Sequence, residues 1–427
     1  MLSNGTVQTM PKFSVGVDAF LIGVRREYRF VLATFAASGL GYLGSAAAPA
    51  IVNALIDAGL DHHQAGDLGT IELLSLAMAA VLIAPYVPIL SHRKLAIGGA
   101  LIAALGLAIS ALSVGYTAMI VGRIATGFGS GLAISGANAA VAAREDAERI
   151  FAIIWTMGGG ITASLAMYLP RVVEGGEYPL GFGALLVLAL VGLPCLFWIP
   201  HKPVAPVQFA TESADSTAST SGSSDSDLKA AFGPLVWMTF AGMFVYSAAE
   251  QGLWAFAYNI PIEAGVDPAL AAQLLAFATI MGLVGGAIAA VLGVRLGRIF
   301  PIVLGCLFSA SGRCLYISSA SGSMLFFATL LWGIGFYFIS PYQIGLVAAV
   351  DRTGRAAVAS VVAFNFGYAV GPGLAGRILQ YMDREWLMMI IAASTLVSML
   401  LFLPLAIRVD RDARIARAPA DHSLDVR

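Results

Sequence analysis

Apolar residues form long uninterrupted runs along this chain, separated by short polar segments. A hydrocarbon layer ~30 Å thick is crossed by about 20 helical residues at ~1.5 Å per residue, which gives about twelve spans. They are predicted at 30–52, 71–90, 95–114, 117–142, 150–170, 179–199, 235–259, 269–293, 300–319, 324–349, 356–379 and 386–407. Membrane strands would show short alternating segments instead, so the pattern predicts an all-α membrane protein.

Residues 201–230 interrupt this pattern. The run "TESADSTASTSGSSDSD" is rich in Ser, Thr and Asp and has no apolar face, which predicts a flexible solvated linker. It separates six predicted spans from the other six. The predicted organisation is an N-terminal segment 1–29, a bundle 30–200, the linker 201–230, a bundle 231–408 and a tail 409–427.

Composition agrees with a lipid environment. Of the 427 residues, 59% are hydrophobic and 11% charged, with a mean hydropathy of +0.84. Soluble proteins are about a quarter charged, so this chain lacks the polar groups to cover its surface in water. The net charge of −1 gives no basic field for nucleic acid, and the lipid bilayer is the expected surrounding partner.

Basic residues mark one side of the membrane. If the N-terminus is cytoplasmic, the cytoplasmic segments hold Arg25, Arg26, Arg29, His92, Arg93, Lys94, Arg144, Arg149, Arg295, Arg298, Arg352, Arg355, Arg408, Arg411, Arg414 and Arg417. The positive-inside rule then places both termini in the cytoplasm. The first 20 residues lack the pattern of a cleaved signal peptide, so a multi-pass protein of the cell inner (plasma) membrane is expected.

Few motifs suggest other chemistry. Cys195, Cys306 and Cys314 lie in apolar runs without metal-ligand spacing, so no disulfide or metal site is expected. The chain has no G-x-x-x-x-G-K-[ST] loop, which disfavours direct coupling to ATP. We expect no cofactor and no enzymatic activity.

The fourth span carries the best local motif. "VGRIATGFGSG" places Arg123 before spaced glycines at Gly127, Gly129 and Gly131. With the six-plus-six layout and the long central loop, this resembles the major facilitator superfamily, over about residues 21–408. The resemblance implies two six-helix bundles that rock about a central site, in a monomeric secondary transporter.

Two motifs of that family are altered. The loop after the second span, "ILSHRKLAIGG", has Ser91 or His92 where the family has an acid, and the second copy has Val294 there. The fifth-span segment "WTMGGGITASLAMYLP" lacks the Gly-Pro pattern associated with exporters. These departures from the family pattern favour symport or facilitated uptake over exchange-driven export.

Charges inside the hydrocarbon cost ~2.5–3.5 kcal/mol at a helix centre and are candidates for function. Arg123 is predicted to anchor a substrate carboxylate or to tune a proton-carrying acid; alternatively it snorkels and braces helix packing. Glu250 is predicted to carry the proton, because desolvation favours the neutral carboxyl; alternatively it only fixes packing. Arg313 is expected to snorkel outward, and Glu72 to lie at the headgroup level or in a vestibule.

Uncharged candidates complete the predicted site. Helical spacing puts Tyr246, Glu250 and Trp254 on one face. The predicted substrate-binding residues are Arg123, Trp155, Tyr246, Gln251, Trp254, Tyr258, Tyr337, Asn365 and Tyr368. Each aromatic residue taken alone is equally explained by packing or by the interfacial belt.

The sequence therefore predicts proton-coupled uptake of a small organic solute, with an organic or aromatic acid as the expected substrate class. A proton-driven efflux carrier of metabolites or drugs is the first alternative. A membrane receptor that binds without transporting is the second.

Overall fold

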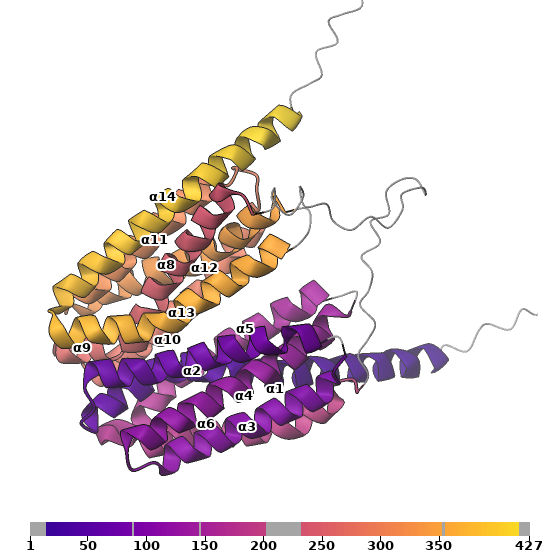
Figure 1. The fold of residues 1–427 in the computed structure, drawn as a ribbon, viewed down its shortest axis with the longest axis horizontal. Coiled ribbons are helices and arrows are strands. Elements are labelled where there is room, and N and C mark those ends of the chain that lie inside the picture. The colour runs from indigo at the N-terminus through magenta and orange to yellow at the C-terminus, as the bar shows by residue number, and fades with distance from the viewer. Residues whose placement is uncertain (1–13, 88, 145–146, 202–231, 352–354, 418–427) are drawn as a thin grey trace, which may run out of the picture.

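The computed structural model describes residues 14–87, 89–144, 147–201, 232–351 and 355–417. Apart from residue 201, the predicted linker lies outside the described residues, as do the first 13 residues and the last part of the tail. The described chain is helical throughout, without strands, which confirms the predicted all-α class. Its helices form two bundles, shown in indigo to magenta and in red to yellow in Figure 1.

The N-terminal bundle contains six long helices. They are α1 (Ser14–Asp57), α2 (His62–Ile83), α3 (His92–Leu112), α4 (Tyr116–Ala142), α5 (Ala147–Val172) and α6 (Tyr178–Gly192), with short 3-10 turns η1 (Ala84–Tyr86), η2 (Glu174–Gly176) and η3 (Leu193–Trp198). Pro194 lies in the first turn of η3, where α6 gives way to 3-10 geometry. A proline there has no N–H to continue the α-helical ladder.

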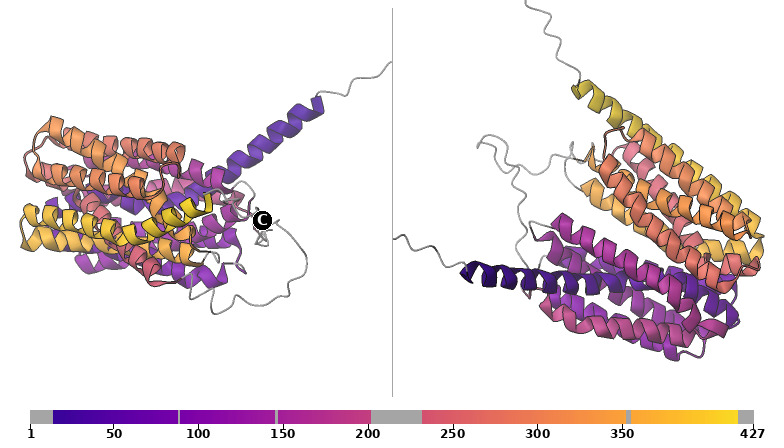
Figure 2. Two further views of the ribbon diagram at one scale, coloured as in Figure 1. Left: turned by 90° about the horizontal axis from the view of Figure 1, so that it is seen from above. Right: turned by 180° about the vertical axis from the view of Figure 1, so that it is seen from behind.

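The C-terminal bundle repeats this plan with one extra short helix. Its elements are α8 (Pro234–Phe256), α9 (Asn259–Glu263), α10 (Pro268–Leu292), α11 (Ile299–Ser318), α12 (Gly322–Ala348), α13 (Arg355–Tyr381) and α14 (Arg384–Arg417). α1 and α14 both extend beyond their predicted spans, and their free ends project from the bundles in Figure 2.

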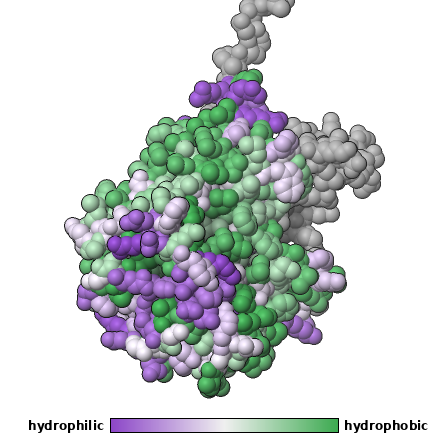
Figure 3. All heavy atoms as spheres, turned by 60° about the vertical axis from the view of Figure 1, so that its left-hand side comes forward, coloured by the Kyte–Doolittle hydropathy of each residue, from purple (hydrophilic) through white to green (hydrophobic). Residues whose placement is uncertain are grey.

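Ten helices of the described chain are long and apolar enough to cross a bilayer. α8 and α13, with 23 and 27 residues, have the length to cross as well and pack between these helices. Figure 3 shows a broad hydrophobic surface with hydrophilic residues gathered toward the ends. Exposed apolar side chains such as Val191, at 69% exposure, belong to that surface and would face lipid.

Glycines set the closest helix contacts. A Cβ on Gly127 of α4 would collide with the backbone of Glu72 on α2, and one on Gly371 of α13 would lie 2.5 Å from the carbonyl oxygen of Ala248 on α8. Backbones approach this closely only where side chains are absent. Gly286 of α10 differs, because a Cβ there would meet nothing within 4 Å.

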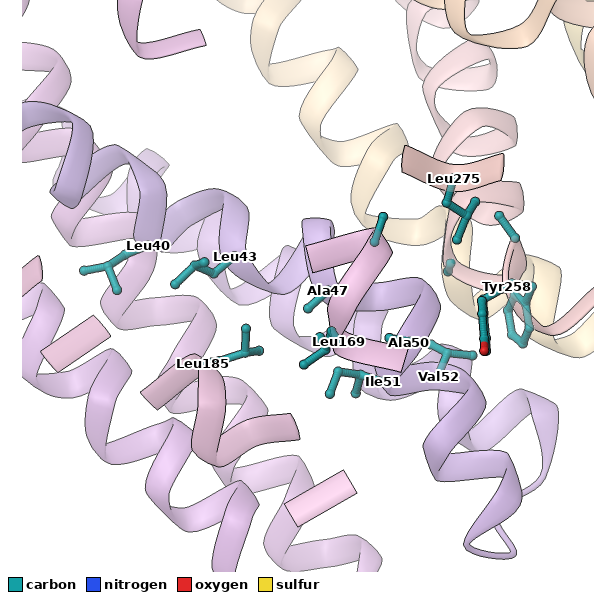
Figure 4. Close-up of a cluster of buried hydrophobic side chains, with 14 of the residues drawn as sticks. Leu40, Leu43, Ala47, Ala50, Ile51, Val52, Leu169, Leu185, Tyr258 and Leu275 are labelled. Carbon is teal, nitrogen blue, oxygen red and sulfur yellow. The ribbon is translucent and has the colours of Figure 1, made fainter. Parts of the chain in front are cut away.

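The two bundles converge at one end and diverge at the other (Figure 1). The end of η3, the start of α8, the start of α1 and the end of α14 all lie at the diverging end. At the converging end a single hydrophobic cluster joins the halves: Val52 of α1 belongs to it together with Tyr258 and Leu275 from the C-terminal bundle (Figure 4). The apolar contact therefore closes the interface on one side only.

Candidate transport site

A buried charged group lies inside the C-terminal bundle. Glu250 of α8 is 5% exposed, and its Oε2 lies 3.6 Å from Nε of Arg313 on α11. The indole Nε1 of Trp332 on α12 donates to both carboxylate oxygens, at 2.8 and 3.0 Å. Three helices therefore converge on one buried carboxylate.

Arg313 does not snorkel outward; that expectation is wrong. Its side chain is fully buried, its Nε donates to the carbonyl of Ser309 at 3.2 Å, and its guanidinium lies 4.8 Å from the ring centre of Tyr246. The Tyr246 hydroxyl and the Ser309 hydroxyl are 2.7 Å apart. Both terminal nitrogens, Nη1 and Nη2, lack a hydrogen-bond partner among the described residues. The sequence did hold a signal for this pairing. Glu250 and Arg313 are opposite charges in apolar runs of the same bundle, and neither charge is stable there alone.

Arg123 forms a second buried group, inside the N-terminal bundle. Its Nη1 lies 2.8 Å from Oε2 of Glu72 on α2, so the headgroup-level position expected for Glu72 is wrong. Its Nε and Nη2 donate to Ser110, Nη2 also to Thr126, and the guanidinium lies 4.3 Å from the Phe182 ring centre. These partners belong to α2, α3, α4 and α6. The contacts turn Arg123 into its own bundle and away from the interface where a solute would bind.

Ser45 of α1 is the meeting point of the two bundles. Its hydroxyl lies 3.1 Å from the Tyr368 hydroxyl of α13 and accepts from Nε2 of Gln251 on α8 at 3.2 Å. Its carbonyl oxygen accepts from Nε1 of Trp254 at 2.8 Å. Three of the predicted binding residues therefore gather on a serine that the sequence did not single out. Oε1 of Gln251 is buried without a partner among the described residues.

Three of the other predicted binding residues lie on α5, α12 and α13. Trp155 of α5 is 56% exposed and its ring lies 5.5 Å from that of Tyr42 on α1. Tyr337 of α12 is half-buried against Gly282 of α10. The side chain of Asn365 on α13 is exposed. Tyr42 is a further aromatic residue at the interface that sequence reasoning missed.

Tyr246 and Trp254 flank the buried carboxylate as their helical spacing predicts. Trp254 packs edge to face on Trp332, with ring centres 6.0 Å apart. Tyr258, one turn further on, is 7% exposed and lies in the hydrophobic cluster of the converging end. It therefore helps to close the interface, and the structure does not bring it to Ser45.

Polar contacts also close the converging end. His62 of α2 bonds Glu263 of α9 at 3.0 Å, and its backbone N–H donates to Gln380 of α13 at 3.0 Å. Arg377 of α13 pairs with Asp67 of α2. The hydrogen bond from His62 lowers the pKa of the Glu263 carboxyl below its usual range.

Further along the interface, Asn259 donates to Asn53 at 3.3 Å, and the N–H of Gly373 donates to Thr70 at 2.9 Å. These hydrogen bonds between the bundles lie between the Ser45 layer and the converging end. No three His, Cys, Asp or Glu side chains of the described chain are grouped as metal ligands would be.

The fold and the site together define a multi-span membrane carrier: two helical bundles closed at one end, with polar and aromatic side chains meeting between them. The family model described as Major Facilitator Superfamily matches residues 30–363. The chain belongs to this superfamily. It is a multi-pass membrane protein with the fold of secondary transporters.

Solved structures agree with this assignment. The chain is similar to the nucleoside transporter NupG, with a TM-score of 0.69 at 16% identity over 89% of this chain and 99% of that one. A POT family transporter in complex with 5-aminolevulinic acid gives 0.67 at 14% identity over 89% and 96%. An inward-facing, unoccupied bacterial homolog of the human lysosomal transporter Spinster gives 0.64 at 16% over 91% and 97%. At these identities the likeness concerns the fold, and no curated protein sequence matches the chain.

Proposed function

We propose that this protein is a proton-coupled secondary transporter of a small organic solute that carries an aromatic ring. Glu250 takes up and releases the proton, and the solute binds between the bundles beside Ser45. The observation that carries the proposal is the buried carboxylate of Glu250, which among the described residues pairs loosely with Arg313 and accepts from the Trp332 indole. A buried carboxylate with one distant cation changes its proton occupancy readily when its surroundings change.

Arg313 supports this role through its geometry. Its separation of 3.6 Å from Glu250 exceeds that of a close charge-assisted bond, about 2.7–2.9 Å, and its terminal nitrogens have no hydrogen-bond partner within the described part of the chain. The pair is therefore not locked. When Glu250 is protonated, the Arg313 guanidinium would still be stabilised by its hydrogen bond to the Ser309 carbonyl and by the ring of Tyr246.

The solute class rests on the residues around Ser45. Tyr42, Trp155, Trp254 and Tyr337 offer ring faces, while Ser45 and Gln251 offer directional hydrogen bonds. Aromatic rings pack well against such faces. The expectation of an acidic solute depends on Arg123, whose donors are occupied by Glu72, Ser110 and Thr126. We therefore propose the ring, and not the carboxylate, as the feature that is recognised.

Membrane orientation follows from the basic residues. The start of α1, the end of η3, the start of α8 and the end of α14 lie at the diverging end, and the positive-inside rule assigns that end to the cytoplasm. We propose that this arrangement is the cytoplasm-facing one of an alternating-access cycle in the cell inner membrane. The missing exporter pattern in α5 is the reason for proposing uptake over efflux.

The test uses purified protein in sealed proteoliposomes. A thermal-shift panel of benzoate, 4-hydroxybenzoate, tryptophan and tryptamine selects a labelled solute. Wild-type protein should then accumulate it only under an inward proton gradient, and a protonophore should abolish accumulation. Glu250→Gln, which mimics the neutral carboxyl, should lose accumulation but keep gradient-free counterflow.

Glu385→Gln, at an exposed carboxylate on α14, is the matched control and should behave as wild type. Accumulation by Glu250→Gln equal to wild type would overturn the assignment of the proton site. Binding without counterflow would favour the receptor alternative. Vesicles of known sidedness then decide between uptake and efflux.

A further inference from the structure

One hydrogen bond between the bundles is made to a backbone carbonyl inside a helix. Nε1 of Trp254 on α8 donates to the carbonyl oxygen of Ser45 on α1 at 2.8 Å. A carbonyl within an α-helix normally accepts the N–H of the residue four positions later. Here that residue is Pro49, which has no N–H. The proline therefore leaves the Ser45 carbonyl available, and the opposite bundle supplies its donor.

The same tryptophan touches the proton site. The Trp254 ring packs edge to face on Trp332 with ring centres 6.0 Å apart. Trp332 is 2% exposed and gives its N–H to both oxygens of Glu250. A continuous chain of contacts thus runs from the Glu250 carboxylate through two indoles to the backbone of the other bundle.

We infer that Trp332 and Trp254 are positioning residues that transmit the ionisation of Glu250 to the Trp254–Ser45 bond, and so to the contact between the bundles. This inference rests on the proposed role of Glu250 as the proton site. While Glu250 is ionised, Trp332 is held and the bond to Ser45 is favoured. When Glu250 is protonated, the hold on Trp332 weakens and the bond to Ser45 loosens.

The physical basis is the change in hydrogen bonding at the carboxyl group. An ionised carboxylate accepts at both oxygens, and its charge-assisted bonds are about twice as strong as neutral ones. A protonated carboxyl presents a donor at one oxygen, so it no longer binds the indole N–H at both. Trp332 is confined by Tyr316, with ring centres 5.4 Å apart, and by Trp254. In a close-packed interior its displacement is passed to its neighbours.

Other titratable groups surround Glu250, and they set the background against which its protonation acts. Among the described residues they are Arg313 and Cys306 on α11, Tyr246 on α8, Tyr337 on α12, Tyr368 on α13 and Tyr42 on α1. Tyrosine side chains ordinarily titrate near pH ~10, above the range of a transport assay, and Cys306 is replaced by alanine in the test below. Glu250 is therefore the group in this cluster whose charge would change.

The test measures the distance between the bundles at the converging end. Spin labels are placed at Ala58→Cys and Ala269→Cys, two exposed positions on opposite bundles, in protein whose three native cysteines are replaced by alanine. Distance distributions are recorded in nanodiscs at pH 8 and pH 5 without solute, so that the proton is the only ligand. In the wild-type background, pH 5 should raise the ratio of separated to closed ends by about tenfold, as for loss of one charge-assisted bond.

Three variants isolate the inferred chain. Trp254→Phe keeps a ring but removes the donor to Ser45, and Trp332→Phe removes the donor to Glu250. Pro49→Ala restores an N–H within α1 that competes for the Ser45 carbonyl without altering either indole. In each variant, lowering the pH should change the ratio of separated to closed ends by less than about threefold. The double variant Pro49→Ala with Trp254→Phe should reduce this pH response no further than either single variant.

Pro404→Ala is the matched control, because it removes a helical proline from α14, whose contacts lie within the C-terminal bundle. It should keep the full response. A wild-type response in Trp254→Phe or in Pro49→Ala would overturn the inference. If Glu250→Gln abolishes the pH response while Trp254→Phe retains it, the inferred transmission through the two tryptophans is wrong, but the assignment of Glu250 as the proton site is retained. If Glu250→Gln itself responds as wild type, the proposed proton site fails. His62 and Glu263 also titrate but remain in every variant, so differences between variants exclude their contribution.

Discussion

The Arg123–Glu72 pair can be assigned to stability or to transport by substitution. Its side chains are 4% and 11% exposed and its charged atoms are 2.8 Å apart. Removing one partner of a buried pair costs about 3–5 kcal/mol because the other charge is left uncompensated. In Glu72→Leu, Arg123 keeps the hydroxyls of Ser110 and Thr126, so we expect the lower end, about 3 kcal/mol of unfolding free energy.

The double variant Glu72→Leu with Arg123→Met should behave differently. It removes both charges and fills the space with apolar side chains. The Ser110 and Thr126 hydroxyls stay satisfied, because they donate to the carbonyls of Gly106 and Gly122 at 2.9 and 2.8 Å. Replacement of a whole buried pair is often neutral or stabilising, so we expect stability within about 1 kcal/mol of wild type.

The assay is reversible unfolding in mixed micelles, applied to wild type, both single variants and the double variant, followed by counterflow in proteoliposomes. A purely structural pair predicts a double variant that is stable and active. A double variant as unstable as Glu72→Leu would refute this account of the packing. A stable double variant without counterflow would instead show that the Arg123–Glu72 pair is needed for transport, as first expected for Arg123.

Three further predictions concern single contacts. Gly44→Ala should destabilise the N-terminal bundle by about 1–3 kcal/mol in the same micelle assay, because its Cβ would collide with the Glu72 carboxylate; unchanged stability would show that α1 shifts freely. Glu263→Gln should weaken closure of the converging end at pH 7, and its difference from wild type should shrink as the pH falls below the usual range of the carboxyl. The reason is that a carboxyl whose pKa is lowered in the closed arrangement stabilises closure while it is ionised, and this contribution is lost once it is protonated. Spin-label distances across pH test this, and a pH-independent difference would contradict it. Arg377→Gln should increase separation at the same end only slightly, since an exposed pair contributes about 0–1 kcal/mol, and a large separation would show that this pair dominates closure.

Hydropathy was sufficient for the fold because each membrane span is a local property. A run of about 20 apolar residues is stable in lipid whatever its neighbours do, and its backbone groups pair within the helix. The predicted spans therefore correspond to the observed helices, including α8 and α13. The predicted helix ends were wrong for α1 and α14, which continue as helices into residues that hydropathy assigned to polar segments.

Charges in the spans were also visible in the sequence, but their partners were not. Glu250 was singled out because an acid in an apolar run is costly. Arg313 was dismissed because distance to the helix end was taken as the criterion for snorkelling. The packing of α8, α11 and α12 brings Arg313 beside Glu250, and no single-helix argument contains that information.

The sequence by itself determined that the chain spans a membrane many times and that a few polar residues must be satisfied inside it. These conclusions depend on transfer free energies, which are additive along the chain. Only the tertiary structure decided which charges pair, that Ser45 joins the bundles, and that Trp254 occupies the carbonyl freed by Pro49. Such contacts join helices far apart in sequence, so they exist only once the packing of the two bundles is known.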